Sequence, residues 1–398
     1  MESPAPQPPR PECRRAHGRV IRAYYFFFYA VLGSYMPFLN LYFDRTLGFS
    51  RSQIGAVFSM RSLMFALSPP VWGMIGDRFR IARALLAAGL GVSMLALLSF
   101  AAVTQFWQAL LAMVVFASFS GPLFPLIDSI AFGYVARVRD SYGRMRIWGS
   151  AGFIGMGLLL YALFRSHSNL RLAFFAGAGA CLLSLLLLPG LPSIRVRSRG
   201  IVGKRAIALY LRRDLLVFTL CGFLGNLAMM SYYTFFSNYL NVLHFDQRWI
   251  GLMWALGAVA EFPVVFFVDS LVRVLGIKTL YAVGLFGVVL RLFVLSLAPP
   301  PAIILLSQGL HALSFGAMYV GGLTYVNRRS PDDLRASAQS IYSATMLGAG
   351  GVTGSLAAGW FADHFGILAM FTIHAGIAAA GLAAFLLLFR ESAASEAV

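Results

Sequence analysis

Charged residues are scarce in this chain of 398 residues, because Lys and Arg number 32 and Asp and Glu only 15. Charged side chains therefore make up 12% of the sequence, whereas soluble domains carry about 25%. So few charges cannot cover a water-facing surface. The composition excludes an ordinary soluble globular protein.

Cysteine is also rare, and the three cysteines, Cys13, Cys181 and Cys221, are too far apart for a disulfide framework or a metal-ligand pair. The sequence has no His-Glu-x-x-His motif and no phosphate-binding loop. We therefore expect no catalytic residues, no metal and no cofactor, and predict that the protein is not an enzyme. A membrane-embedded enzyme or a nucleic-acid-binding membrane protein remains the alternative from another class.

Long hydrophobic runs are what the sequence has in abundance, since 59% of its residues are hydrophobic. A bilayer span needs about 20 mostly apolar residues. Runs of that kind begin near Ile21, Ile54, Ala84, Trp107, Ile147, Leu172, Leu215, Trp249, Thr279, Ala302, Ser337 and Gly366. The sequence predicts an all-α integral membrane protein with twelve transmembrane helices.

The net charge of +17 would by itself allow a nucleic-acid partner. Sorting the basic residues by predicted loop places 25 on one side of the membrane and 5 on the other, with Arg61 and Arg291 inside spans. The positive-inside rule then predicts that both termini are cytoplasmic. Most of the charge is thereby assigned to topology, so we expect no nucleic-acid partner. We expect the basic loop from Arg195 to Arg213 to contact anionic lipid headgroups.

The longest polar break follows the sixth span and divides the chain into two halves of six spans each. This arrangement is typical of transporters built from two pseudo-symmetric six-helix bundles. A faint repeat supports it, since SRSQIGAVF at 50–58 and DQRWIGLMW at 246–254 occupy corresponding places. We predict a basic cytoplasmic tail (1–20), an N-terminal bundle (21–189), a basic central loop (190–213), a C-terminal bundle (214–389) and a cytoplasmic tail (390–398).

The break between the second and third spans reads GMIGDRFRIAR at residues 73–83. It resembles the cytoplasmic loop signature of the major facilitator superfamily, with a glycine four residues before an Asp-Arg pair. Gly73 would permit close helix packing, and Asp77 with Arg78 would latch one closed state. The alternative is an ordinary basic loop that only marks the cytoplasmic side.

Spans four and five carry Pro125-Leu-Ile-Asp128 and the segment YGRMRIWGSAGF at 142–153. These residues resemble the phenylpropionate permease family and, more distantly, the lactose permease group of oligosaccharide:proton symporters. The resemblance implies that Asp128 and Arg146, with Ser150 and Phe153, contribute to a substrate site. It also implies a monomeric multi-pass protein of the bacterial inner membrane. A structural ion pair between Asp128 and Arg146 is the alternative.

The second half continues the resemblance, with Glu261 in span eight, Arg291 in span nine and His311 in span ten. Charges inside a membrane are costly and often functional. Pairing and separating Glu261 and Arg291 would alternately release and take up a proton, and His311 could participate. A static buried pair is the alternative. Ser314 stands where the lactose permease group has a carboxylate, so that relay does not transfer intact.

Arg61 in span two has no obvious acidic partner in the sequence. It could attract an anionic substrate or instead extend along its helix toward the membrane surface. Together these residues predict a secondary transporter that takes up a small organic anion, such as a 3-phenylpropionate-like aromatic acid, with a proton. A sugar, nucleoside or drug carrier on the same fold is the alternative.

Overall fold

The computed structural model describes residues 11–79, 81–138, 141–192 and 204–390, with only the backbone for residues 11–16, 77 and 265. These residues form helices, and no strand occurs among them. Within the described ranges, ten helical segments are long and apolar enough to cross a membrane, and one bent pair adds an eleventh. The 54-residue segment Arg335–Leu388 turns back at Gly366, where φ is +85°, and so crosses twice. The predicted all-helical membrane fold is confirmed, and the ten segments agree with twelve predicted spans when the bent pair is added and the reversed segment is counted twice.

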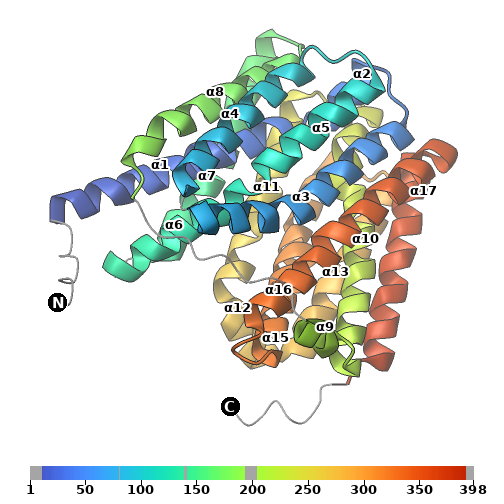
Figure 1. Ribbon diagram of the computed structural model, residues 1–398. Helices are drawn as coiled ribbons and strands as arrows, with labels where there is room; N and C mark the ends of the chain where they lie inside the picture. The colour runs from blue at the N-terminus through green and yellow to red at the C-terminus, as the bar shows by residue number, and fades with distance from the viewer. Residues whose placement is uncertain (1–10, 80, 139–140, 193–203, 391–398) are drawn as a thin grey trace, which may run out of the picture.

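The first half of the chain forms one bundle, coloured blue to green in Figure 1. Its elements are α1 (Pro11–Tyr35), α2 (Leu39–Arg45), α3 (Arg51–Phe79), α4 (Ala82–Phe100), α5 (Phe106–Ser120), α6 (Leu123–Val138), α7 (Tyr142–Ser166), α8 (Arg171–Leu187) and η1 (Leu188–Gly190). The first helix begins at Pro11, ten residues before the predicted apolar run. The predicted tail residues 1–10 lie outside the described chain.

The second half forms another bundle, coloured yellow to red apart from its first helices (Figure 1). Its elements are α9 (Lys204–Tyr210), α10 (Arg213–Val242), α11 (Arg248–Ala260), α12 (Phe262–Leu275), α13 (Ile277–Ser296), α14 (Pro301–Ser307), η2 (Gln308–Leu310), η3 (Ala312–Val320), α15 (Gly321–Arg329), α16 (Arg335–Ser343), η4 (Ala344–Gly350) and α17 (Gly351–Leu388). The predicted central loop and the last tail lie partly outside the described chain, at residues 193–203 and 391–398.

The eighth span is broken at Glu261, which ends α11 and precedes α12. Pro263 follows within the first turn of α12, and proline cannot donate the backbone hydrogen bond that would continue one helix. The 53° bend of this span lies a little further on, between residues 248–264 and residues 266–275. The Glu261 carboxylate therefore lies close to a bend in a membrane helix.

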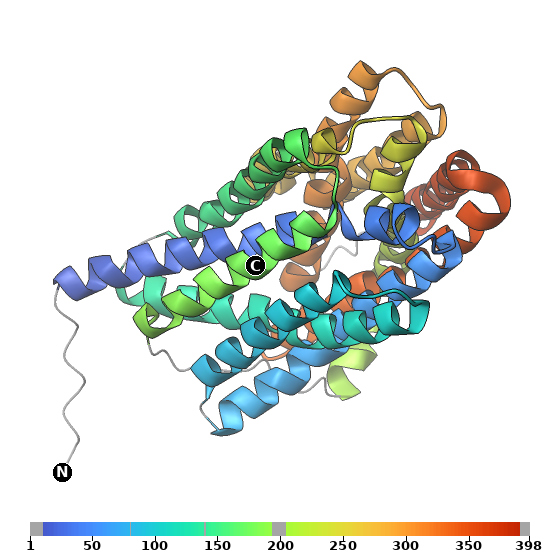
Figure 2. The same cartoon turned by 90° about the horizontal axis from the view of Figure 1, so that it is seen from above.

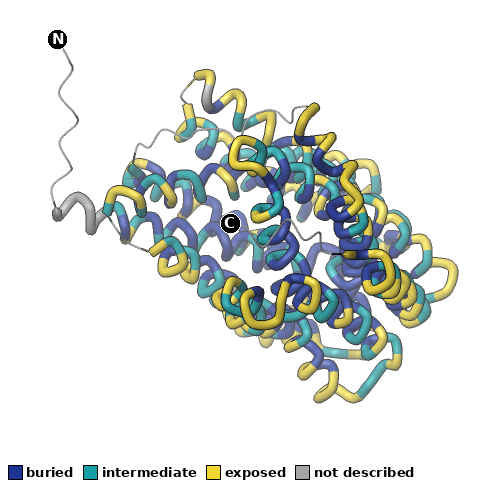
Figure 3. The backbone as a smooth tube through the Cα atoms, turned by 90° about the horizontal axis from the view of Figure 1, so that it is seen from below, coloured by how far each residue is buried: buried dark blue, intermediate teal, exposed yellow. Residues whose placement is uncertain are grey.

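Large apolar side chains cover the outward faces of the helices as well as the interior. Leu111, Phe266 and Leu387 are 66%, 79% and 77% exposed, and Figure 3 shows exposed residues along the outer faces with buried residues between them. An apolar surface of this extent is stable only against lipid. The helices are therefore arranged as a membrane protein requires.

The two bundles meet at one end and diverge toward the other (Figures 1 and 2). We call the end at which they meet the closed end; it contains α2 and the start of α3. The opposite end, where the first bundle begins with α1 and the second ends with α17, is the open end. At the closed end Asn40 donates to the Thr234 carbonyl, and Asn238 donates to Asp44 Oδ2 over 2.9 Å.

Glycines allow the bundles to approach closely at this end. A Cβ on Gly55 of α3 would lie 2.5 Å from the Ser355 carbonyl oxygen of α17, and one on Gly359 would lie 2.6 Å from the Arg51 carbonyl oxygen. On the other side of the interface, a Cβ on Gly157 of α7 would lie 3.1 Å from the carbonyl oxygen of Gly251 in α11. Backbone-to-backbone contact at two places closes this end of the interface.

Candidate transport site

Asp128 on α6 is held by two tyrosine hydroxyls. Tyr25 of α1 donates to Asp128 Oδ1 over 2.6 Å, and Tyr142 of α7 donates to the same oxygen over 3.0 Å. Among the described residues no direct ion pair joins Asp128 to Arg146, so the predicted pairing is not found in this conformation. Because both hydroxyls use Oδ1, the second carboxylate oxygen is left for another donor.

Arg146 lies on α7 one turn after Tyr142 and is half-buried. Its guanidinium carbon stands 4.1 Å over the centre of the Tyr29 ring. The interaction with this ring is a cation–π contact, which uses a face of the guanidinium and none of its N–H donors. In the described chain these donors meet no carboxylate at ion-pair distance.

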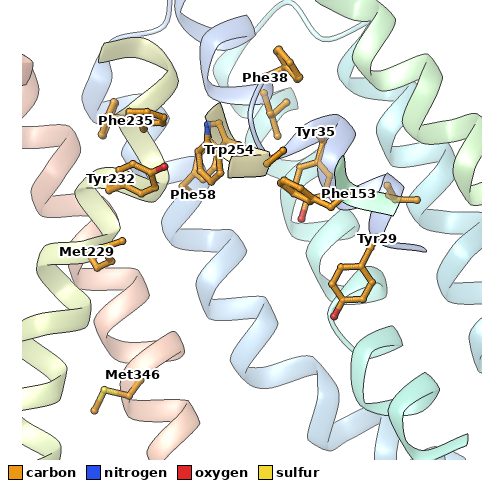
Figure 4. Close-up of a cluster of buried hydrophobic side chains, with 14 of the residues drawn as sticks. Tyr29, Tyr35, Phe38, Phe58, Phe153, Met229, Tyr232, Phe235, Trp254 and Met346 are labelled. Carbon is orange, nitrogen blue, oxygen red and sulfur yellow. The ribbon is translucent and has the colours of Figure 1, made fainter. Parts of the chain in front are cut away.

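The other residues predicted for the substrate site lie in the same bundle. Arg61 of α3 contacts the Phe65 ring at 4.7 Å and donates weakly to the Tyr35 hydroxyl over 3.4 Å, while its buried Nε is unpaired. Ser150 is half-buried one turn beyond Arg146. Phe153 is buried and faces Tyr35 in the cluster of aromatic side chains shown in Figure 4.

The aromatic cluster joins the bundles. Figure 4 shows Tyr35, Phe58, Phe153 and Trp254 directed toward one another from α1, α3, α7 and α11. Trp254 also donates from Nε1 to Ser237 Oγ over 3.1 Å. The cluster therefore continues the contact between the bundles inward from the closed end.

In the second bundle, the His311 side chain lies between those of Arg291 and Glu261 and contacts both. Arg291 Nη1 donates to His311 Nδ1 over 2.7 Å, and His311 Nε2 lies 3.5 Å from Glu261 Oε2. Because arginine only donates, Nδ1 must accept and the histidine proton must be on Nε2, facing the carboxylate. The predicted direct pair between Glu261 and Arg291 is replaced by this histidine-bridged arrangement.

Arg291 is fully buried and tightly held. Its Nη2 donates to Gln308 Oε1 over 2.8 Å, and the same oxygen accepts the Tyr232 hydroxyl over 2.8 Å. The Tyr232 ring lies 3.7 Å from the guanidinium carbon. These contacts hold the Arg291 guanidinium in place, whereas the Glu261 side chain is 25% exposed.

Arg146 belongs to the first bundle and Glu261 to the second, and no ion pair joins them among the described residues.

The proposed cytoplasmic latch lies near the open end of α3. Gly73 is half-buried, and exposed Arg78 has its guanidinium 5.6 Å from the Phe79 ring. The side chain of Asp77 lies outside the described residues. In the second bundle, Asp269 of α12 pairs with Arg328 over 3.2 Å.

Sequence reasoning did not assign Tyr25, Tyr29, Tyr142 or Gln308 to the site. Tyr25 and Tyr29 belong to the aromatic run that opens the first span, and their spacing of four residues places both on one helix face. Gln308 precedes His311 by three residues, which is also a same-face spacing. The described residues contain no group of three or more His, Cys, Asp or Glu side chains suited to a metal ion.

Two helical bundles that contact at one end, with a few buried charges at their interface, define the fold of a secondary transporter. The sequence matches the model of the MFS_1 like family over residues 19–373. The chain therefore belongs to this family of major facilitator transporters.

The names of the curated relatives refer to different substrates. The maltose permease of Geobacillus stearothermophilus is 26% identical over 96% of this chain and 97% of its own length. The probable 3-phenylpropionic acid transporter of Escherichia coli (strain K12) is 25% identical over 86% of this chain and 90% of its own. The crystal structure of the nucleoside transporter NupG superimposes with a TM-score of 0.83 at 20% identity, covering 94% and 99% of the two chains. The structural likeness supports the fold.

Proposed function

We propose that this transporter carries a small organic anion, such as a 3-phenylpropionate-like aromatic carboxylate, inward together with a proton. The observation that carries the proposal is Arg146, a half-buried cation whose N–H donors meet no carboxylate at ion-pair distance among the described residues. A planar guanidinium in that state is suited to bidentate binding of a carboxylate. Burial in the membrane makes an unneutralised cation costly, so a bound anion stabilises it.

The charges near the interface favour an anion over a cation. Arg61, Arg146 and Arg291 oppose two carboxylates, Asp128 and Glu261. One negative ligand charge balances the set, and the aromatic side chains beside Arg146 can contact an apolar ring. Arg61 lies in the same bundle as Arg146 and also attracts the anionic substrate.

Glu261 is the proposed proton carrier, with Arg291 and His311 as its support. The fixed Arg291 holds the His311 Nε2 proton toward the carboxylate. When Glu261 takes up a proton the site loses one negative charge, and a carboxylate bound at Arg146 restores it. Anion and proton binding therefore favour each other, which is the coupling that a symporter requires.

The distribution of basic residues predicts that the open end faces the cytoplasm. The conformation described is then closed to the outside, and transport requires the contacts at the closed end to separate. Gly73, Asp77 and Arg78 would form the alternative contacts on the cytoplasmic side. In transporters with paired bundles, the contacts at one end open while those at the other end form, and the bundles rock against each other.

A nucleoside or sugar is the second candidate substrate, and two observations favour it. Asp128 has an oxygen without a tyrosine donor, and Glu261 is partly exposed. Two carboxylate acceptors near aromatic rings would also suit a ligand that combines hydroxyl groups with a ring. Relatives are named for maltose and for nucleosides, so the uptake experiment also tests these substrates.

The test is uptake into proteoliposomes with an imposed pH gradient. Radiolabelled 3-phenylpropionate should accumulate when the outside is acidic, and Arg146→Lys should abolish accumulation, because an ammonium lacks the planar fork. Arg165→Lys, at the exposed far end of the same helix, is the matched control. Inhibition by uridine or maltose without any transport of aromatic acids would favour the second candidate.

A further inference from the structure

Gly149 leaves the space in which Tyr29 and Arg146 stack. A Cβ at this position would lie 2.7 Å from Tyr29 Cδ2 and 3.0 Å from Arg146 Nη1. Real Cβ atoms do not approach ring carbons so closely, so any larger residue must displace the ring or the guanidinium. The ring and the cation therefore share a space that only glycine provides on this face of α7.

The Tyr29 ring cannot easily turn away from Arg146. Phe124 of α6 packs against it edge to face at 5.6 Å and 87°, and Phe28 does so at 5.6 Å and 90°. The residue is 9% exposed. A ring fixed from two sides is a rigid support, and rigid support is what orients a long, flexible arginine side chain.

We infer that Tyr29, seated against Gly149, is the positioning residue that orients Arg146. As a result, the site selects its anion by the distance between the carboxylate and the aromatic ring of the substrate. The inference rests on the proposed function and deepens it. We call Tyr29, Gly149 and Phe124 the arginine socket. Tyr29 itself need not touch the substrate.

The proposed selectivity among aromatic acids follows from the immobility of the Arg146 guanidinium. An unsupported arginine could follow the carboxylate of a longer or shorter acid by changing its side-chain torsions. A guanidinium held over a fixed ring binds well only those acids whose carboxylate reaches it while the apolar ring stays in contact with the protein. The site should therefore discriminate among benzoate, phenylacetate, 3-phenylpropionate and 4-phenylbutyrate.

The first experiment measures half-saturation constants for these four acids in proteoliposomes. Tyr29→Phe keeps the ring and should stay within about twofold of the wild type. Tyr29→Leu and Gly149→Ala should raise the constant for the preferred acid about tenfold and flatten the differences among the four. Gly143→Ala is the matched control on the same helix, because a Cβ there meets only Ser141 Oγ at 3.7 Å.

A double variant distinguishes positioning from general damage. If Gly149→Ala acts by displacing the ring, it should have little further effect in the Tyr29→Leu background. Additive effects would overturn the inference, as would unchanged discrimination in both single variants. Loss of activity in Tyr29→Phe would also overturn it, since the hydroxyl rather than the ring would then be responsible.

A measurement without substrate separates this inference from the proposed function. In protein labelled with ¹⁵N-arginine, the Nε–H signal that disappears in Arg146→Lys should be shifted upfield by the ring current of Tyr29. The shift should persist in Tyr29→Phe and vanish in Tyr29→Leu and Gly149→Ala. If the wild type carries none of the four acids, the proposed function fails; absence of the upfield shift would refute the socket itself.

Discussion

Asp363 of the second bundle caps the first turn of a helix in the other bundle, because its Oδ2 accepts the backbone N–H of Ser52 over 2.7 Å. Its Oδ1 accepts the N–H of Arg51 over 2.8 Å. The first N–H groups of a helix have no partner within the helix and attract negative charge. At the closed end, α3 is therefore completed by a carboxylate that must leave when the bundles separate.

Removal of this cap should loosen the closed end. Loss of an N-cap costs about 1 kcal/mol, so Asp363→Ala should shift the equilibrium toward the state opened at this end by about fivefold. Distances between spin labels on α3 and α17 would report the change. Asp246→Ala is the control, since it breaks only a local contact with Arg248 at 3.0 Å. An unchanged distance distribution in Asp363→Ala would show that the cap does not hold the bundles together.

Glu261→Gln should separate binding from proton coupling. The amide keeps the size of the side chain and an acceptor toward His311 Nε2, but it cannot take up and release a proton. We expect exchange of labelled for unlabelled substrate to persist while accumulation driven by a pH gradient is lost. Asp269→Asn, at a carboxylate paired with Arg328 away from the interface, should retain both activities. Gradient-driven accumulation in Glu261→Gln would remove this residue from the coupling mechanism.

Gln308 should be important for stability because one oxygen satisfies two buried donors. Gln308→Leu would leave Arg291 Nη2 and the Tyr232 hydroxyl without that acceptor, at a cost of about 1–3 kcal/mol for each group. Thermal unfolding in detergent should show a clear loss of stability. Gln339→Leu removes a single, half-buried hydrogen bond to Asn327 and should cost less. Equal stability of the two variants would contradict the assigned role of Gln308.

The arrangement of spans could be predicted because hydrophobic length and arginine distribution are local properties of the sequence. The reversal at Gly366 was predicted from the start of an apolar run and is realised by a positive φ that glycine adopts easily. The break at Glu261 was not predicted, although Pro263 marks it. A single proline in an apolar run is common in membrane helices and does not identify a break.

The charged residues could be predicted, but their partners could not. Glu261, Arg291 and His311 were identified because charge inside a span is costly. Which of them touch depends on the rotation of three helices about their own axes, and one residue of rotation moves a side chain by about 100°. The pairing of Asp128 with tyrosines rather than Arg146 has the same cause. Asp363 remained unassigned because its partners are backbone groups about 310 residues earlier in the chain.

Gly152 should tolerate no side chain, because the backbones of α1 and α7 are in contact at this residue. A Cβ would overlap the Phe26 carbonyl oxygen, and the nearest atoms are all backbone. Backbone cannot move aside as a side chain can, so Gly152→Ala should cost at least about 1–3 kcal/mol and separate the two helices. Thermal unfolding of the purified protein would measure the loss. Gly179→Ala on α8 is the control, since no atom lies within 4 Å of its added Cβ. A Gly152→Ala protein as stable as this control would mean that α1 and α7 pack less closely than described.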